Sequence, residues 1–543
     1  MKSFGFQGCL TGCLRAMLAL SAAAGLWAAD RAEAASLTIG MATAPTSIDP
    51  HFHLLATNMS IGAHIFEPLV KQNAGQRPVP GLATAWRLID PLTWEFTLRR
   101  GVKFQDGSDF TAEDVAFSLK RVPLVPNSPS SFAVYTRSIQ SWDIVDPHTI
   151  RLHTKTPTPD LPLALSLIAI MSHQAASGEA REGKTTSQLN AGNGTVGTGP
   201  YRFTSYVPGD RVVLAKNDHY WGEKEPWDTV TILAQSNGAA RVAAALSGQV
   251  DIVEKVSGEN LEAVQRSSKV ALVTTPSNSV TYIVLDQGRD TSPGVSGTDG
   301  RNPLKDPKVR AALSLALNRE GISRLVMTEM AVPAAELAGE GMFGTTPDAA
   351  PEPFKLDEAR RLLANAGWGG GFNLSLATTS GVYVQDTQTA QAIAAMWTRL
   401  GVRTTVESTP APVFYGRRNS GELSAFVTSS SIMTGQASDL LNIYLATPNK
   451  EKSLGGVNFS GYSNPKVDAL LEAASQEMDP VKRAELLQQT TRIAVAEDHA
   501  MLPVFVEKIG YAVRRPLVFS PRVDKWVTAM QVRDPGTRAS PSQ

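Results

Sequence analysis

Helix-like and strand-like segments alternate through the second half of this 543-residue chain, and this alternation constrains the fold more than any other feature. Apolar residues over 390–400 share one helical face and end at Gly401, and strand-like residues 402–407 follow directly. Residues 357–366 are a further predicted helix and residues 423–428 a further predicted strand. Such alternation is typical of α/β domains. The chain is also too long for one hydrophobic core, so we expect two or three domains.

The first half is richer in predicted strands. Residues 94–99 alternate between apolar and polar side chains, as a half-buried strand does, and Thr111 and Asp114 have the spacing of a capping box that opens a helix. The remaining predicted strands are 36–41, 149–154, 201–207, 211–216, 229–234 and 501–506, and the remaining predicted helices are 56–70, 238–246, 464–474 and 480–497. This early run of strands predicts an extra β-rich domain inserted into the first lobe.

Two further predicted strands, 270–275 and 280–286, are joined by Pro276-Ser277-Asn278. A short connection of this kind, between segments that are both apolar, predicts a hinge between two lobes.

The first 34 residues read as a secretory signal peptide. Lys2 and Arg15 precede the apolar run 16–29, and Ala32-Glu33-Ala34 offers small residues for cleavage near Ala34. The apolar run is shorter than the roughly 20 residues that a membrane span needs, so we expect export to the periplasm. Residues 10–13 also match a lipoprotein processing box, but the main apolar run follows Cys13 instead of preceding it.

Both cysteines, Cys9 and Cys13, lie inside this segment, so the processed chain would have no disulfide, no thiolate metal site and no cysteine nucleophile. The chain contains 51 Lys and Arg residues against 51 Asp and Glu residues. This balance provides no field to attract nucleic acid, and we expect no nucleic-acid partner.

Several motifs match a functional pattern without its context. Residues 178–185 fit the phosphate-loop spacing, but Gly192 soon interrupts any helix after them. Gly192, Gly194 and Gly197 fit the dinucleotide spacing but lead into a strand. No pair of histidines has the i, i+4 spacing of a helical metal site. We expect no cofactor, no metal and no catalytic residue, and therefore no enzyme.

From residue 36 onward the sequence resembles the family 5 solute-binding proteins, the dipeptide, oligopeptide and nickel group of ABC transporters. The stretches that carry this resemblance are 94–107, 110–115, 197–201, 217–221, 248–251, 306–310 and 461–465. The resemblance implies an α/β, two-lobed periplasmic binding protein of type II, similar to cluster C, with an extra β-rich inserted domain. Lobe I would comprise 36–75, 196–277 and 508–543, the inserted domain 76–195, and lobe II 278–507.

This resemblance also implies a function. The protein would be a monomer that captures a small peptide-like ligand between its lobes and delivers it to the permease of an ABC transporter in the inner membrane. It would meet the membrane only through that transporter complex. Ligand contacts to both lobes would stabilise the closed form over the open form.

The resemblance places the ligand site in the loop after strand 423–428. Peptide-binding relatives hold the peptide ammonium there with an aspartate, whereas this chain has Thr434, and we interpret Asp439 as the cap of the next helix. Candidate ligand-binding residues are Ser430, Ser431, Thr434, Gly435, His53, Asn58, Tyr135, Asn278 and Tyr383.

Because Thr434 offers no negative charge, other ligands stay open: an opine, a sugar derivative, or a nickel chelate that would use His51 or His53. An alternative from another class is an exported α/β hydrolase, which would need Ser430 or Ser431 activated by a neighbouring base.

Overall fold

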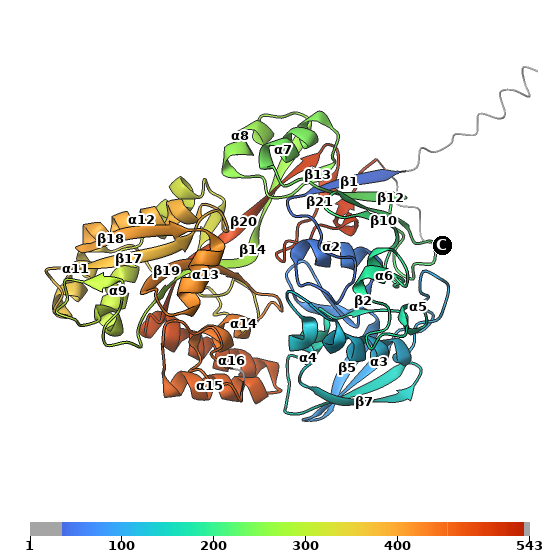
Figure 1. The fold of residues 1–543 in the computed structure, drawn as a ribbon, viewed down its shortest axis with the longest axis horizontal. Helices are drawn as coiled ribbons and strands as arrows, with labels where there is room; N and C mark the ends of the chain where they lie inside the picture. The colour runs from blue at the N-terminus through green and yellow to red at the C-terminus, as the bar shows by residue number, and fades with distance from the viewer. Residues whose placement is uncertain (1–34, 453, 537–543) are drawn as a thin grey trace, which may run out of the picture.

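The computed structural model describes residues 35–452 and 454–536. The predicted signal peptide lies outside these residues. Two lobes share one twelve-stranded sheet, and Figure 1 shows β14 and β20 running between them. These two strands are long, β14 (Val270–Leu285) and β20 (Met501–Arg514), and they pair antiparallel along their length. The alternation of helices and strands therefore correctly predicts an α/β fold, and the two lobes implied by the resemblance are present.

The first lobe is built around its own part of the sheet, in the order β10, β11, β12, β1, β13, β20. Its strands are β1 (Ser36–Met41), β10 (Tyr201–Val207), β11 (Arg211–Lys216), β12 (Thr229–Ala234), β13 (Ile252–Val253), β21 (Val518–Phe519) and β22 (Val532–Arg533). Its helices are α2 (Ala56–Ile65), α7 (Gly238–Ser247), α8 (Gly258–Gln265) and the short η7 (Ala529–Gln531). One core contains residues from both ends of the chain, including Leu37, Ile39 and Val532.

A second, four-stranded sheet of order β5-β6-β8-β7 lies beside this lobe, at the lower right of Figure 1. Its strands are β5 (Ala83–Asp90), β6 (Thr93–Leu98), β7 (Ile139–Asp146) and β8 (Thr149–Thr154). The neighbouring elements are α3 (Ala112–Arg121), η1 (Val122–Leu124), η2 (Phe132–Tyr135), α4 (Leu161–Leu165), α5 (His173–Ala176) and α6 (Thr186–Asn190). Short pairs β2 (Glu67–Pro68) with β9 (Ala169–Ile170), and β3 (Val70–Gln72) with β4 (Pro78–Pro80), connect it to the first lobe.

The other lobe has helices on both faces of its strands, and each face has its own apolar core. Its strands are β15 (Val295–Ser296), β16 (Ala331–Pro333), β17 (Phe372–Thr379), β18 (Val402–Thr409) and β19 (Ala425–Ser431). Its helices are η3 (Pro303–Lys305), α9 (Pro307–Leu315), α10 (Arg319–Gly321), η4 (Ile322–Val326), α11 (Leu356–Asn365), α12 (Asp386–Leu400), α13 (Ala411–Asn419), α14 (Ser438–Leu440), η5 (Leu441–Leu445), α15 (Pro465–Gln476), α16 (Pro480–Thr491) and η6 (Arg492–Glu497).

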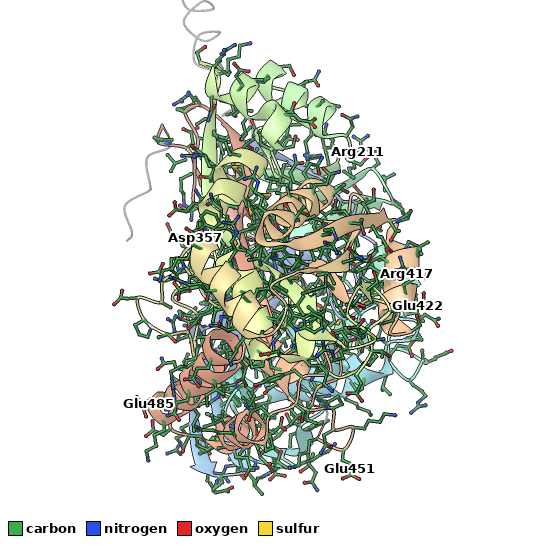
Figure 2. The ribbon with its side chains drawn as sticks, turned by 90° about the vertical axis from the view of Figure 1, so that its left-hand side faces the viewer. Arg211, Asp357, Arg417, Glu422, Glu451 and Glu485 are labelled. Atoms are coloured by element: carbon green, nitrogen blue, oxygen red, sulfur yellow. The ribbon has the colours of Figure 1, made fainter. Side chains whose placement is uncertain are left out.

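Exposed charges of both signs are spread over the outer surface, among them Asp357, Glu422 and Arg211 (Figure 2). Within the described ranges, no helix combines the length and the apolar character that a membrane crossing requires.

The structure corrects three predicted boundaries. The helix predicted over 56–70 ends at Ile65, because Pro68 disfavours helix for the residue before it and Glu67 pairs with Ile170 instead. The predicted strands 270–275 and 280–286 form the single strand β14, and its register against β20 shifts between Pro276 and Val280. The helix predicted over 480–497 stays α-helical only to Thr491 and continues as a π-turn.

Candidate functional site

Side-chain hydroxyls form a cluster at the ends of β17 and β19 in the second lobe. Tyr383, in the loop after β17, places its hydroxyl 3.1 Å from that of Tyr415 and 3.2 Å from Thr428 Oγ1. Ser430, near the end of β19, lies 2.7 Å from the Tyr282 hydroxyl and 2.9 Å from that of Tyr444. These residues gather where the parallel strands β17 and β19 end, and ligands of open α/β sheets bind at this edge.

The backbone of β19 also has an unpaired edge near these hydroxyls. β19 pairs with β14 as far as Ser431, but it pairs with β17 only at Leu376↔Ala425 and Ala377↔Phe426. Among the described strands, none pairs with the β17-facing edge of residues 427–431. An extended ligand backbone can form hydrogen bonds with such an edge.

The first lobe carries an apolar pocket with about 450 Å³ of space that is partly open to solvent. The residues that line it include Met59, Phe66, Leu167 and Trp526. Asn58 and His53 lie at its polar margin, and both are bonded to Thr46: the Asn58 Oδ1 accepts from its amide at 3.1 Å, and the His53 Nδ1 lies 3.0 Å from its hydroxyl.

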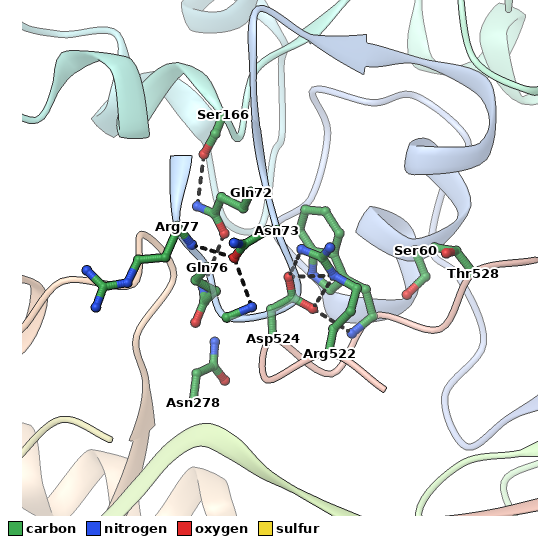
Figure 3. A network of polar contacts seen from close by, with 12 residues as sticks. Ser60, Gln72, Asn73, Gln76, Arg77, Ser166, Asn278, Arg522, Asp524 and Thr528 are labelled. Carbon is green, nitrogen blue, oxygen red and sulfur yellow. Dashed lines mark hydrogen bonds and ion pairs between the residues drawn. The ribbon is translucent and has the colours of Figure 1, made fainter. Parts of the chain in front are cut away.

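The two lobes already touch beside the hinge, where Gln76 lies close to Asn278 (Figure 3). Gln76 Nε2 donates to the carbonyl oxygens of Ile432 at 3.1 Å and Met433 at 2.9 Å, and Gln72 Nε2 reaches the Met433 oxygen at 3.3 Å. Gly435 permits this approach: a Cβ there would lie 2.7 Å from the Gln76 oxygen, and its φ of 74° suits glycine. Gly435 therefore packs against the other lobe in this conformation.

Asn278 is buried at the same junction. Its side chain donates to the Ile432 oxygen at 2.7 Å, and its backbone amide donates to the Val523 oxygen, also at 2.7 Å. Asn278 thus ties the hinge strand to both lobes, a structural role that does not depend on ligand.

Thr434 and Asp439 form a buried pair. The Thr434 amide donates to Asp439 at 2.9 Å and its hydroxyl donates at 2.6 Å. The interpretation of Asp439 as a helix cap is wrong, because Asp439 lies within α14 and accepts hydrogen bonds from the preceding loop instead. A carboxylate is therefore present where we expected only a hydroxyl. Burial raises the pKa of Asp439 to about 6, against the hydrogen bonds from Thr434, which lower it.

Tyr135, from the β-rich region, is close enough to Asp439 to interact with its charge. It ends η2, and its pKa is raised by burial and by the charge of Asp439. Burial lowers the pKa of the nearby Arg483, and the charges of Asp160 and Asp439 raise it. Tyr135 and Asp160 thus face Asp439 across the contact between the two lobes.

We predict that Asp439 makes stability decrease as pH rises. Because its folded pKa is raised, the folded state binds more protons between the usual pKa of 3.8 and about 6, and stability falls by about 1.4 kcal/mol per pH unit there. Asp439→Asn lacks this loss. The unfolding free energy of the variant in urea, minus that of the wild type, should therefore increase as pH rises from 4 to 6.5. Exposed Asp357→Asn is the control. A constant difference between Asp439→Asn and the wild type across this interval would contradict the prediction.

The histidines do not form a metal site. His51 is fully buried, 2.8 Å from the Ala169 oxygen and 3.1 Å from an Arg121 nitrogen, and its pKa is lowered to about 4 by burial and by the charge of Arg121. The placement of His51 on a nickel chelate is therefore wrong. Within residues 35–452 and 454–536, no three His, Cys, Asp or Glu side chains are positioned to hold a metal ion.

Sequence reasoning missed Gln72, Gln76, Tyr415, Tyr444 and Trp526. Gln72, at the end of β3, and Gln76 bond to the Met433 oxygen of the other lobe. Tyr415 and Tyr444 belong to the hydroxyl cluster, and Trp526 lines the apolar pocket. An aromatic residue within the polar stretch 520–526 was the only signal that could have identified Trp526.

Two lobes joined by two hinge strands, one with an apolar pocket and the other with a hydroxyl cluster, define a two-lobed binding protein. The family model for bacterial extracellular solute-binding proteins, family 5 (middle), matches residues 77–452. Glutathione-binding protein GsiB of Salmonella choleraesuis is 26% identical over 500 residues, which cover 91% of this chain and 93% of GsiB. Heme-binding protein A of Haemophilus influenzae is 26% identical over 511 residues, which cover 90% of this chain and 88% of that protein.

Among solved structures, the unliganded open form of MppA, a periplasmic murein tripeptide binding protein, superposes with a TM-score of 0.77 at 24% identity. It covers 92% of this chain and 97% of MppA. The chain described here belongs to family 5 of the bacterial extracellular solute-binding proteins.

Proposed function

We propose that this protein captures a peptide or peptide-like solute between its lobes and delivers it to the permease of an ABC importer in the inner membrane. The observation that carries the proposal is the unpaired edge of β19 over residues 429–431, which are partly exposed, beside the hydroxyls of Tyr383, Ser430 and Tyr444. A strand edge offers regularly spaced amides and carbonyls, and these match a peptide backbone better than a sugar ring.

The relatives support this ligand class. GsiB is named for binding glutathione and MppA for a murein tripeptide, and both names describe small peptides. The proposal includes a lobe I of 36–75, 196–277 and 508–543, an inserted domain of 76–195 and a lobe II of 278–507. It also includes a monomeric, exported protein that meets the membrane only through the transporter.

The rival function, an exported hydrolase, requires a serine beside a base. Ser430 contacts only tyrosine hydroxyls in this structure, whereas Ser431 Oγ lies 2.9 Å from the Lys525 ammonium nitrogen. A binding protein returns its ligand unchanged, so recovery of the ligand separates the two functions.

Closure of the lobes on ligand is the test. The only cysteines of the chain are Cys9 and Cys13, so new cysteines in the chain from residue 35 on can be labelled selectively. We expect energy transfer between dyes at Val145→Cys, on β7, and Val413→Cys, on α13, to rise when a ligand binds; both side chains are about half exposed. The panel comprises glutathione, murein tripeptide, dipeptides, an opine and nickel–histidine.

The control pair, Val413→Cys with exposed Val481→Cys on α16, lies within one lobe and should show constant transfer. Tight binding without a change in the interlobe pair, or a ligand recovered in altered form, would show that the protein does not act by capture and closure.

A further inference from the structure

A lysine from the C-terminal segment reaches the hinge. Lys525 Nζ contacts the hydroxyls of Ser279, on β14, and Ser431, at the end of β19, the latter at 2.9 Å. The two serine oxygens lie 2.7 Å apart. One ammonium and two hydroxyls therefore meet where β14, the end of β19 and the C-terminal segment come together.

The turn that carries Lys525 is held from both lobes. Lys525 has a φ of 69°, a left-handed conformation that is unfavourable for a non-glycine residue. Asp524 fixes this turn by accepting hydrogen bonds from the Arg522 guanidinium and from the Trp526 amide, at 3.1 Å. The Val523 amide donates to the Ala74 oxygen at 3.0 Å, and its own oxygen accepts from Asn278. Trp526, the next residue, lines the apolar pocket.

The charge of Lys525 has no counterion. Among the described residues, no carboxylate lies within 4.0 Å of its ammonium, and Asp524 is paired with Arg522. Burial lowers the pKa of Lys525, and the charges of Glu507 and Glu254 only partly compensate. A buried cation without a partner is unfavourable. The ammonium still has one N–H to donate, and both serine hydroxyls can rotate to donate to an anion.

We propose that Lys525, with the hydroxyls of Ser279 and Ser431, binds a carboxylate of the captured solute. This inference rests on the proposed function and specifies the charge of its ligand. A carboxylate here is bonded by Lys525 of one lobe and Ser431 of the other, so it links the lobes directly. The apolar pocket that contains Trp526 then receives a neighbouring apolar group of the same ligand.

Benzoate and its neutral counterpart benzamide are the first probes, because an aromatic acid matches both Trp526 and Lys525. Melting temperatures are measured at constant ionic strength for the wild type, Lys525→Met and the control Lys482→Met, which alters an exposed lysine on α16. We expect benzoate to stabilise the wild type and Lys482→Met more than benzamide does, and to act like benzamide on Lys525→Met. Equal effects of the two compounds on the wild type would overturn the inference.

The melting temperature without ligand is a second readout. Because methionine removes an uncompensated buried charge, Lys525→Met should melt at or above the wild-type temperature. A marked decrease would show that Lys525 is a structural tie between the strands and not a ligand group.

Peptide pairs then test the ligand itself. Each panel dipeptide is compared with its C-terminal amide, and we expect the carboxylate form to bind at least tenfold more tightly to the wild type and equally to Lys525→Met. If carboxylate and amide close the lobes alike, the inference about Lys525 fails and the proposed function stands. If the wild type distinguishes benzoate from benzamide but no peptide closes the lobes, the proposal of a peptide ligand is rejected and the carboxylate site is retained.

Discussion

Arg121→Met is expected to lower the free energy of unfolding by about 3–5 kcal/mol. Arg121, at the end of α3, donates to both carboxylate oxygens of Asp49, at 2.8 and 2.7 Å, and both side chains are almost completely buried. Burial alone would raise the pKa of Asp49, but the hydrogen bonds and the charge of Arg121 hold it below its usual value. Without Arg121 this carboxylate remains buried with only Thr186 and the His51 amide as donors.

Urea unfolding at pH 7 measures this effect. The control is the double variant Arg121→Met with Asp49→Asn, which removes both charges and should recover part of the loss, because the uncompensated anion is gone. A single variant as stable as the wild type would show that the ion pair does not hold α3 against the loop after β1.

Trp526→Ala is expected to weaken binding of the panel compound that closes the lobes by about 2–4 kcal/mol, roughly 30- to 1000-fold in Kd. Trp526 is the largest side chain of the apolar pocket, which Met59 and Phe66 also line, and its removal takes away an aromatic surface that a ligand would cover there. Isothermal calorimetry with that compound gives the Kd directly.

Two variants make the result specific. Trp526→Phe keeps an aromatic wall and should lose less affinity, and Trp368→Ala alters a tryptophan that stacks on Arg301 away from the pocket, with no expected effect. Equal affinities for Trp526→Ala and the wild type would place the ligand outside the pocket.

Regular elements were predictable from this sequence because local patterns determine them. The strands 36–41, 149–154 and 201–207 have the predicted bounds, and the capping box correctly locates α3, with the Thr111 amide donating to Asp114 at 2.8 Å. Boundaries failed where tertiary contacts decide them. The extension of β20 to Arg514, beyond the predicted 501–506, depends on pairing with β14, which no local pattern encodes.

Part of the candidate site came from the resemblance, which placed Ser430 and Ser431 in the loop after strand 423–428. Tyr383 lies near the same strand ends, and His53 and Asn58 line the apolar pocket, while their roles as ligand-binding residues stay predictions. Gln76 and Lys525 were not predictable as site residues, because both reach the hinge from loops. Their φ values of 58° and 69° follow from no sequence pattern. Asp439 was misinterpreted since a cap and a buried acceptor look alike in sequence.

The first and last described parts of the chain share one core, and this determines the order of assembly. Leu37 of β1 and Val532 of β22 belong to the same cluster, and the Val532 oxygen accepts from Trp227 at 3.4 Å. β1 lies inside the sheet, between β12 and β13, and β20 pairs with β13. During synthesis this lobe therefore remains incomplete until nearly the whole polypeptide has emerged, and contacts of such long sequence separation form slowly. Truncation before residue 517 would leave the β1 lobe without β21, η7 and β22, and therefore without the residues that complete its core.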